Sequence, residues 1–254
     1  MSRSQPLPLV LGHRGYRARF PENTLLAFRE ALRAGADGIE CDLQKSSDGR
    51  YVIIHDPESE RVAGVSLVVE RTSLDDLKRL DCGSGERIPL LEELMQSLPA
   101  ETYLDLELKE ETLRPFDTDG IIHILDAHRT REHLMISSFD PNLLLPFRQR
   151  GFTVGFLVGE KVARKGLSRL AKILLRLRPQ FLNLSADIVS MLGPRRAGFL
   201  FHALRLLGFS LLFWTVNVGT QAASLAPYAR IIVTDEVERI IEALRSATGK
   251  TTDF

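Results

Sequence analysis

Apolar and polar positions along the chain follow two alternating patterns. Short, mostly apolar runs are followed by longer segments in which apolar side chains recur three and four positions apart. The first pattern predicts β-strands, and the second predicts amphipathic helices. Strands are predicted at residues 8–12, 38–43, 103–109, 134–138, 153–158, 181–185, 211–216 and 230–233. Helices are predicted at residues 24–34, 90–98, 118–129, 141–150, 162–177, 193–207, 219–225 and 236–246. This alternation favours an α/β protein with a parallel sheet closed into a single (β/α)8 TIM barrel.

A hairpin is predicted to extend the second strand. After Asp42 there is no room for a helix before the next apolar run, and residues 46–49 read as a tight turn that ends in glycine. Segments 38–45 and 50–55 should therefore pair as antiparallel strands. Folding about this turn brings His55 back beside Asp42, on the same face of the ribbon.

Residues 56–87 form the least regular part of the chain. A short strand is predicted at 65–69, and a short helix is predicted through the leucines of 74–80. The pattern shows no second domain and no internal repeat. We therefore expect one barrel domain over residues 1–254, with residues 56–87 as a short inserted lobe.

The composition narrows the classes of function. Hydrophobic residues make up 44% of the 254 positions, which is enough for one core, and 33 basic residues balance 33 acidic ones. A formal net charge of zero argues against a general nucleic-acid binder, whose affinity comes from basic patches. The two cysteines, Cys41 and Cys82, are expected to be free thiols in a reducing compartment.

Neither a signal peptide nor a transmembrane segment is predicted. The apolar run at 7–11 is too short for a signal peptide, and it leads directly into His13. Segment 197–213 is apolar but is interrupted by a histidine, an arginine and a glycine, so it reads as a buried helix followed by a strand. A cytoplasmic location is predicted, and the pattern does not indicate an oligomeric state.

Three carboxylates are predicted to meet near the ends of neighbouring strands. Glu40 and Asp42 are two residues apart, so they point to the same face of their strand. On a later strand Glu107 shares one face with Asp105 and Lys109, and this face should point into the barrel. Glu40, Asp42 and Glu107 offer three hard oxygen ligands without a Cys or His cluster. This set suits Mg²⁺ or Ca²⁺ rather than zinc, and Mn²⁺ stays open.

Two histidines and two cations are expected beside these carboxylates. His13 and His55 are the candidate acid/base pair, because one neutral and one protonated imidazole can remove and supply protons near neutral pH. Which of the two is the acid stays open. Arg14 and Lys109 are candidate phosphate ligands, since Arg offers a two-pronged donor and Lys a point charge. Salt bridges to the carboxylates are the alternative for both.

Two further residues are candidates for the substrate pocket. Asn217 is a candidate polar lining group, and Trp214 is a candidate wall, with a core position as its alternative. The remaining histidines lie on predicted helices or loops and are expected to be structural; they are His123, His128, His133 and His202.

Many of these residues occur in motifs that resemble the glycerophosphodiester phosphodiesterase family. The motifs are His13-Arg14-Gly15, Pro21-Glu22-Asn23-Thr24, Gly35-Ala36-Asp37, Glu40 with Asp42, Asp48-Gly49, His55-Asp56, Ile88-Pro89, Leu106-Glu107-Leu108-Lys109, Ser138-Phe139, Trp214-Thr215-Val216-Asn217 and Thr234-Asp235. They span nearly the whole chain in the family's order. The resemblance implies metal ligation by Glu40, Asp42 and Glu107, and acid/base roles for His13 and His55. Members of the family usually carry a small lobe after the hairpin that helps to choose the leaving group.

The resemblance implies metal-dependent hydrolysis of a small phosphodiester, such as glycerophosphocholine or glycerophosphoethanolamine, to glycerol 3-phosphate and an alcohol. The basic segment 161–178 is expected to be an ordinary outer helix of the barrel, with contact to a membrane surface as the alternative. That alternative would fit a lysophospholipase D or a phospholipase-like enzyme. A barrel that binds a phosphorylated ligand without catalysis is a third interpretation.

Overall fold

The computed structural model describes residues 7–128, 131–159 and 167–247, and it confirms the predicted barrel. Its parallel strands are β1 (Leu9–His13), β2 (Gly38–Lys45), β4 (Tyr103–Leu108), β5 (Leu134–Ser138), β6 (Thr153–Val158), β7 (Phe181–Ser185), β8 (Ser210–Trp214) and β9 (Ala229–Thr234). Within the described residues the sheet runs in the order β1, β9, β8, β7, β6, β5, β4 and β2. Parallel pairing between β1 and β2 then closes the ring.

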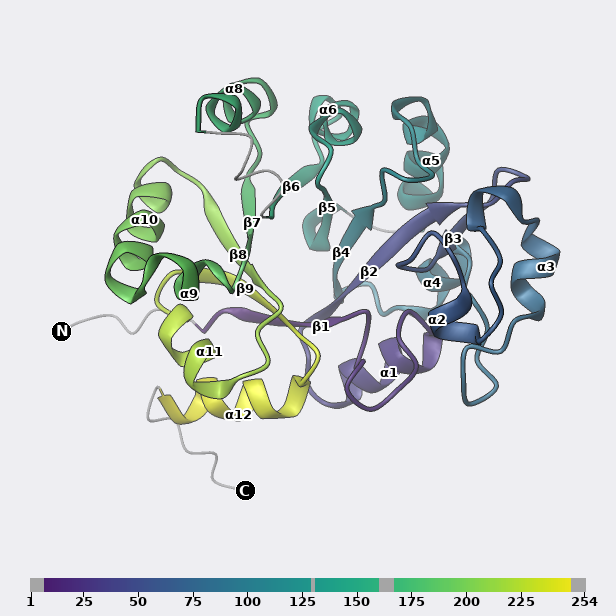
Figure 1. Cartoon of the computed structure of the whole chain (residues 1–254), viewed down its shortest axis with the longest axis horizontal. Coiled ribbons are helices and arrows are strands. Elements are labelled where there is room, and N and C mark those ends of the chain that lie inside the picture. The colour runs from purple at the N-terminus through teal and green to yellow at the C-terminus, as the bar shows by residue number, and fades with distance from the viewer. Residues whose placement is uncertain (1–6, 129–130, 160–166, 248–254) are drawn as a thin grey trace.

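Helices follow the strands and surround the sheet (Figure 1). They include α1 (Leu25–Arg33), α4 (Leu91–Ser97), α5 (Thr118–His128), α6 (Pro141–Gln149), α8 (Leu167–Leu177), α10 (Pro194–Leu206), α11 (Gly219–Leu225) and α12 (Val237–Ala247). Short turns of helix that were not predicted include η2 (Pro115–Asp117), η3 (Arg131–His133) and α9 (Ile188–Leu192). The first turn of the helix predicted at 162–177, with Arg164 and Lys165, lies outside the described residues, as does Lys161 of the basic segment.

The predicted hairpin is confirmed. Strand β3 (Tyr51–Ile53) pairs antiparallel with the end of β2, and Leu43 lies opposite Ile53. Gly49 in the connecting turn has φ of 79°, a conformation that glycine adopts without steric cost. In addition, the backbone N–H of Ile54 donates to the carbonyl of Asp42 at 2.9 Å. The hairpin therefore returns the chain to Asp42 immediately before His55.

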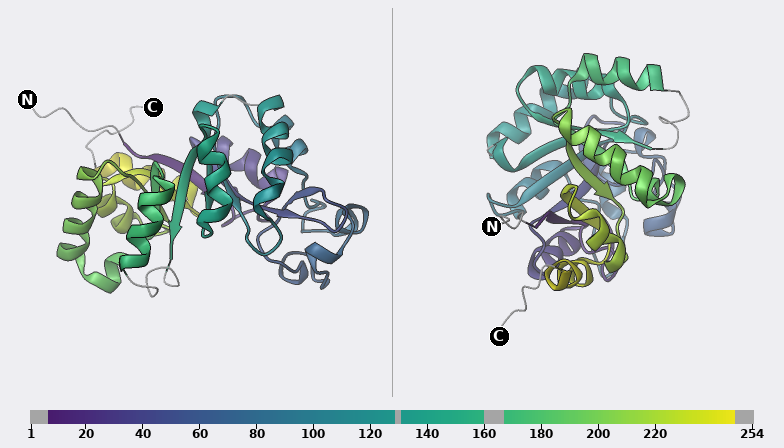
Figure 2. Two further views of the ribbon diagram at one scale, coloured as in Figure 1. Left: turned by 90° about the horizontal axis from the view of Figure 1, so that it is seen from above. Right: turned by 90° about the vertical axis from the view of Figure 1, so that its left-hand side faces the viewer.

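The segment after the hairpin packs on its own small core. It contains α2 (Glu60–Ala63), η1 (Val69–Arg71) and α3 (Leu74–Arg79), and it projects from the side of the barrel opposite α10 (Figure 2). Its apolar cluster includes Val52 and Ile54 of the hairpin together with Val69, Leu77 and Ile88. The strand predicted at 65–69 is wrong. Only one bridge, from Glu58 to Val68, forms there, because the chain turns into η1 and buries Val69 in this cluster.

The register of β2 and β4 determines which side chains enter the barrel. Asp42 is the direct neighbour of Glu107 across the two strands. The intervening residues, such as Cys41 and Leu106, belong to the core between the sheet and the helices. The two strands approach closely at Gly38, where only glycine fits, since a Cβ there would lie 1.9 Å from the carbonyl oxygen of Tyr103. Cys41 and Cys82 are both free cysteines, as predicted, and both are buried.

Segment 197–213 forms most of α10 and then β8, as predicted, but α10 is not a buried helix. It buries Ala197 and Phe201, whereas Phe199 is 79% exposed and Leu206 is 76% exposed. The strong apolar content of the segment therefore reflects an exposed apolar face in addition to the core face. Among the described residues, no helix has the length and apolar character needed to cross a membrane.

Candidate active site

Three carboxylates from β2 and β4 meet inside the barrel, and those of Glu40 and Asp42 are buried while that of Glu107 is partly buried. Glu40, Asp42 and Glu107 each offer an oxygen within 4.8 Å of the others. Burial, followed by the charges of Asp42 and Glu107, raises the pKa of Glu40 well above its usual value. Burial also raises the pKa of Glu107, to about 7, against the opposing effect of Lys109. Three carboxylates held this close repel one another, so the site suits a bound cation.

Two cations of the chain partly offset this charge. The Lys109 ammonium lies 2.8 Å from Glu107 Oε1 and 3.2 Å from Asp42 Oδ1. The Arg14 guanidinium lies 3.3 Å from Asp42 Oδ2, and its backbone N–H donates to Glu40 Oε2 at 3.1 Å. Burial alone would raise the pKa of Asp42, but Lys109 and Arg14 outweigh it and hold that pKa well below its usual range. The salt bridges expected as the alternative for Arg14 and Lys109 are therefore present.

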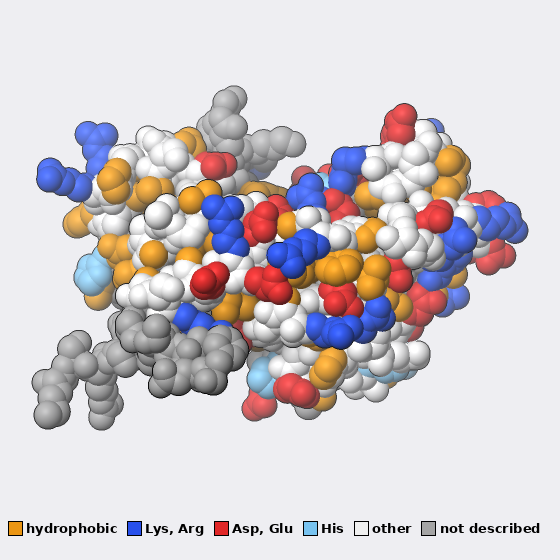
Figure 3. Space-filling model, turned by 90° about the horizontal axis from the view of Figure 1, so that it is seen from below, with side chains coloured by type: hydrophobic (Ala, Val, Ile, Leu, Met, Phe, Trp, Pro, Cys, Tyr) orange, Lys and Arg blue, Asp and Glu red, His pale blue; other side chains and the backbone are white. Residues whose placement is uncertain are grey.

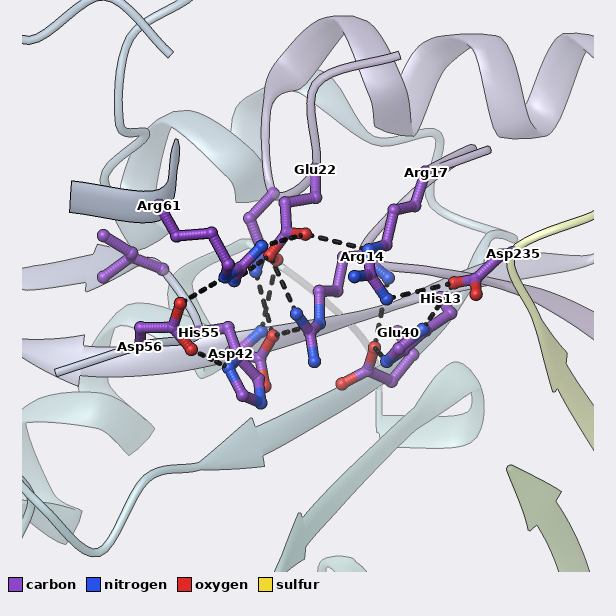
Figure 4. A network of polar contacts seen from close by, with 12 residues as sticks. His13, Arg14, Arg17, Glu22, Glu40, Asp42, His55, Asp56, Arg61 and Asp235 are labelled. Carbon is purple, nitrogen blue, oxygen red and sulfur yellow. Dashed lines mark hydrogen bonds and ion pairs between the residues drawn. The ribbon is translucent and has the colours of Figure 1, made fainter. Parts of the chain in front are cut away.

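Each candidate catalytic histidine is paired with an aspartate through its Nδ1 atom. His13 Nδ1 lies 2.7 Å from Asp235 Oδ1, and His55 Nδ1 lies 2.6 Å from Asp56 Oδ1. The other nitrogen of His13, Nε2, is 3.9 Å from Glu40 Oε2. Burial lowers the pKa of His55 in spite of the nearby Asp42 charge. The acidic cluster thus lies between two Asp–His pairs, one on each side (Figure 4).

The carboxylate of Glu22 links the loop after β1 to both sides of the site. Arg14 Nη1 donates to it at 2.8 Å, Arg17 Nε lies 2.8 Å from it, and Arg61 holds both of its oxygens at 2.7 Å. Burial would raise the pKa of Glu22, but the bonds from Arg61 and Arg14 lower it to about 2. Arg61 also donates to Asp56 through Nε at 2.5 Å. Figure 4 shows these groups as one continuous network.

The two candidate pocket residues occupy different positions. Asn217 donates to Asp235 Oδ2 at 2.7 Å and accepts from the backbone N–H of Asp235 at 2.9 Å. It therefore braces Asp235. Trp214 lines a small cavity together with His13, Glu40 and Glu107, and it meets Phe139 edge to face at 5.8 Å.

The chain is similar in sequence to known glycerophosphodiester phosphodiesterases. A sequence model of the glycerophosphoryl diester phosphodiesterase family matches residues 13–238. The chain belongs to this family. A glycerophosphodiester phosphodiesterase from Caldanaerobacter subterraneus subsp. tengcongensis is 36% identical over 141 residues, which is 52% of this chain and 58% of that relative. The first curated relatives are matched over only 58 to 61% of their own length.

Solved structures of the family resemble the whole barrel. A glycerophosphodiester phosphodiesterase from Thermotoga maritima has a TM-score of 0.79 and 27% identity, over 92% of this chain and 97% of that chain. A phosphodiesterase from Oleispira antarctica, solved in complex with the product sn-glycerol-3-phosphate, has a TM-score of 0.79 and 26% identity. That match covers 94% of this chain and 97% of the other.

Several residues that surround the acidic cluster and the two histidines were not predicted as site residues. Asn23 donates to Asp42 Oδ2 at 2.9 Å from a backbone with φ of 56°. Asp105 lines the same cavity as Trp214, is 2% exposed, and has a pKa that burial raises to about 8. Asp56 and Asp235 carried a signal in the sequence, because each follows a strand end within a family motif. Nothing in the sequence indicated a role for Arg61, because this residue lies in the inserted segment, whose sequence pattern is the least regular of the chain.

Proposed function

We propose that this chain hydrolyses glycerophosphodiesters, such as glycerophosphocholine or glycerophosphoethanolamine, to glycerol 3-phosphate and a free alcohol. The observation that carries the proposal is the pair of imidazoles around the acidic cluster, each held through Nδ1 by an aspartate. This arrangement offers two proton-transfer groups on either side of a position for a cation. Membership of the family supports the same reaction class.

The donor set suits a hard divalent cation. Glu40, Asp42 and Glu107 offer only carboxylate oxygens, which Mg²⁺, Ca²⁺ and Mn²⁺ prefer. When bound, such an ion polarises the phosphoryl group and lowers the pKa of a neighbouring hydroxyl. Lys109 and Asn23 would orient the ligand oxygens, because both already hold Asp42.

The chain's own residues move the protons. Hydrolysis of a phosphodiester requires the attacking oxygen to lose a proton and the leaving alkoxide to gain one. With Nδ1 held by Asp235, His13 keeps Nε2 for the substrate, and His55 keeps Nε2 in the same way beside Asp56. The attacking oxygen belongs either to water or to the substrate's glycerol hydroxyl, and the second route gives a cyclic phosphate first.

Arg14 and Lys109 would compensate the charge on the phosphate. Arg14 and Lys109 are 8% and 7% exposed, so their charges act in surroundings with little screening by water. Both point into the acidic cluster, where they hold carboxylate oxygens. Loss of one such donor typically lowers the rate by about 10²–10³-fold.

A substrate panel tests the proposal. Glycerophosphocholine, glycerophosphoethanolamine and glycerophosphoglycerol are incubated with the protein and Mg²⁺, Ca²⁺, Mn²⁺ or chelator, and released alcohol and glycerol 3-phosphate are measured. We expect turnover that depends on the cation and is abolished by the chelator. Binding of cation and substrate without release of either product would instead support the non-catalytic phospho-ligand barrel.

A lipid phosphodiester is the second candidate substrate. The exposed side of α8 carries Arg169, Lys172 and Arg176, and Leu175 beside them is 73% exposed. Hydrophobic side chains also gather at the end of the molecule that holds α10, at the left of Figure 3. Phe199 of α10 is exposed. Basic and apolar side chains on one surface are typical of contact with anionic lipid headgroups.

The two substrates can be separated by one comparison. Turnover of glycerophosphocholine and of lysophosphatidylcholine is measured with and without anionic vesicles. Faster turnover of the lysolipid, increased further by vesicles and reduced in Phe199→Ser, would identify a lysophospholipase D. A preference for the water-soluble diester that vesicles do not change would leave the first candidate.

A further inference from the structure

The two Asp–His pairs are braced by different parts of the molecule. Asp235, the partner of His13, accepts a hydrogen bond from Asn217, and both residues lie at the ends of barrel strands. Asp56, the partner of His55, accepts instead from Arg61 of the inserted segment, at 2.5 Å. Thus one imidazole is oriented by the barrel, and the other by a segment outside it.

His55 itself lies beyond the end of regular structure. Strand β3 ends at Ile53, and the backbone carbonyl of His55 is held by the Gln44 side-chain amide at 2.9 Å. This contact fixes the backbone but not the ring. The ring is held by Asp56, its neighbour in the chain, so its orientation depends on what holds Asp56.

The Arg61 guanidinium holds the Asp56 carboxylate in place. Arg61 uses Nε for Asp56 Oδ2 and uses Nη1 and Nη2 for the two oxygens of Glu22, at 2.7 Å each. Two-pronged contacts between arginine and a carboxylate are short and directional, and lysine cannot reproduce them. The Glu22 side chain is only 8% exposed and is itself held by Arg14 and Arg17, so Arg61 is anchored to a rigid point.

The contacts join both imidazoles in one arc of alternating charge. Arg17 Nη1 lies 3.6 Å from Asp235 Oδ1, which extends the network from Glu22 to His13. On the other side of Glu22, Arg61 and Asp56 extend it to His55. Figure 4 shows this arc from Asp235 to Asp56 across the loop after β1.

We propose that Arg61 is a positioning residue that orients the His55 imidazole through Asp56, and that Glu22 anchors it. The inserted segment thereby controls the acid/base geometry on one side of the site. The inference rests on the proposed function for its kinetic consequence, but the orientation of His55 can be measured without turnover.

The first measurement is spectroscopic. In the metal-free protein, the His55 Nδ1–H proton held by Asp56 should give a downfield proton resonance protected from exchange, which His55→Gln identifies. We expect this resonance to broaden or disappear in Arg61→Ala and Arg61→Lys, and to persist in the control Arg71→Ala, whose residue lies exposed in the same segment. An unchanged resonance in Arg61→Ala would overturn the proposal whether or not the protein is active.

The second measurement is kinetic. In Arg61→Ala and Arg61→Lys we expect kcat to fall by about 10- to 100-fold, as for other residues that orient a catalytic group, with KM changed by less than about threefold. The double variant Arg61→Lys with Asp56→Asn should be no slower than Asp56→Asn alone, since both act on one ring. Multiplicative effects in the double variant would show that Arg61 acts independently of Asp56, and a lower Tm with unchanged kcat would show that Arg61 only stabilises the fold; either result would overturn the proposal. Arg61→Lys keeps the charge, and it remains testable if Arg61→Ala does not fold.

Discussion

His13 Nδ1 and Asp235 Oδ1 lie 2.7 Å apart, although 222 positions separate the two residues in the chain. The contact exists because β1 and β9 are neighbours in the closed sheet and Gly12 lies beside Thr234 in their register. On the other side of the site, His55 and Asp56 form the equivalent pair from adjacent positions. The same aspartate–histidine contact therefore forms twice. Closure of the sheet brings together His13 and Asp235, and the hairpin places His55 and Asp56.

Replacement of Asp235 by asparagine should impair catalysis without unfolding the protein. The amide introduced by the substitution can donate to Nδ1 of His13 and so place the imidazole proton on the wrong nitrogen, which lowers kcat by about 10⁴-fold in a comparable aspartate–histidine pair. We expect a loss of about 10²–10⁴-fold in kcat for the Asp235→Asn variant. Steady-state kinetics measure it, with the exposed Asp187→Asn as the control. Activity within about twofold of the unmodified protein would remove Asp235 from the mechanism.

The two histidines should be essential and non-redundant. We expect His13→Ala and His55→Ala to keep the far-ultraviolet circular dichroism and melting transition of a folded barrel and to lose nearly all turnover, because each proton transfer has a single group to serve it. His202→Ala, on the exposed side of α10, serves as the control and should be fully active. Turnover near the normal value in either active-site variant contradicts the assignment.

A divalent cation should stabilise the folded chain through the acidic cluster. At a concentration about 100 times its Kd, a ligand of the native state adds about 2.7 kcal/mol, or roughly 5–10 °C in Tm for a barrel of this size. Calorimetry with Mg²⁺, Ca²⁺ or Mn²⁺ against chelator measures the shift. Glu107→Gln should abolish it, whereas Glu110→Gln, an exposed residue beside the site, should keep it. A shift that survives in Glu107→Gln would place the ion elsewhere.

The Glu22 carboxylate and its three arginine partners should make the free energy of unfolding depend on pH in the acid range. The pKa of Glu22 is about 2 in the folded chain against 4.5 ordinarily, so its contribution is present above about pH 4.5 and is lost as the pH falls toward 2. The shift corresponds to at most about 3 kcal/mol. Urea unfolding should show Glu22→Gln to be less stable by up to this amount at pH 7, with a difference that shrinks below about pH 4.5.

The matched variant for this test is Glu132→Gln, an exposed glutamate that should lose nothing. If the difference between Glu22→Gln and the unmodified chain stays constant from about pH 7 to about pH 3, the three arginines do not stabilise the ionised carboxylate.

Local spacing was sufficient to predict the barrel, the hairpin and the meeting of Glu40, Asp42 and Glu107. Strand alternation fixes which side chains share a face, and a turn ending in Gly49 fixes the return of the chain. Physical reasoning from spacing could not predict the bracing of the site. The contact of Arg61 with Glu22 joins residues 39 positions apart, one in the short helix α2 and the other in the loop after β1, and no periodicity in the sequence of either segment indicates where its side chains point.

The errors had a similar origin. Residues 65–69 are rich in β-branched side chains, which favour a strand by propensity, but the small core under the inserted segment takes Val69 through a helical turn. In α10 the apolar content indicated burial, yet Phe199 and Leu206 point away from the sheet. Composition counts apolar residues but does not tell on which side of a helix they lie.

Because Asp42 and Glu107 are register partners on adjacent strands, their separation follows the spacing of about 4.8 Å between hydrogen-bonded strands. That spacing is common to all parallel sheets and owes nothing to the loops of this particular protein. The acidic centre could therefore be transferred: a Glu-x-Asp strand paired in the same register with a Glu strand, at the mouth of another closed barrel, would place the backbone positions of all three carboxylates in the same way.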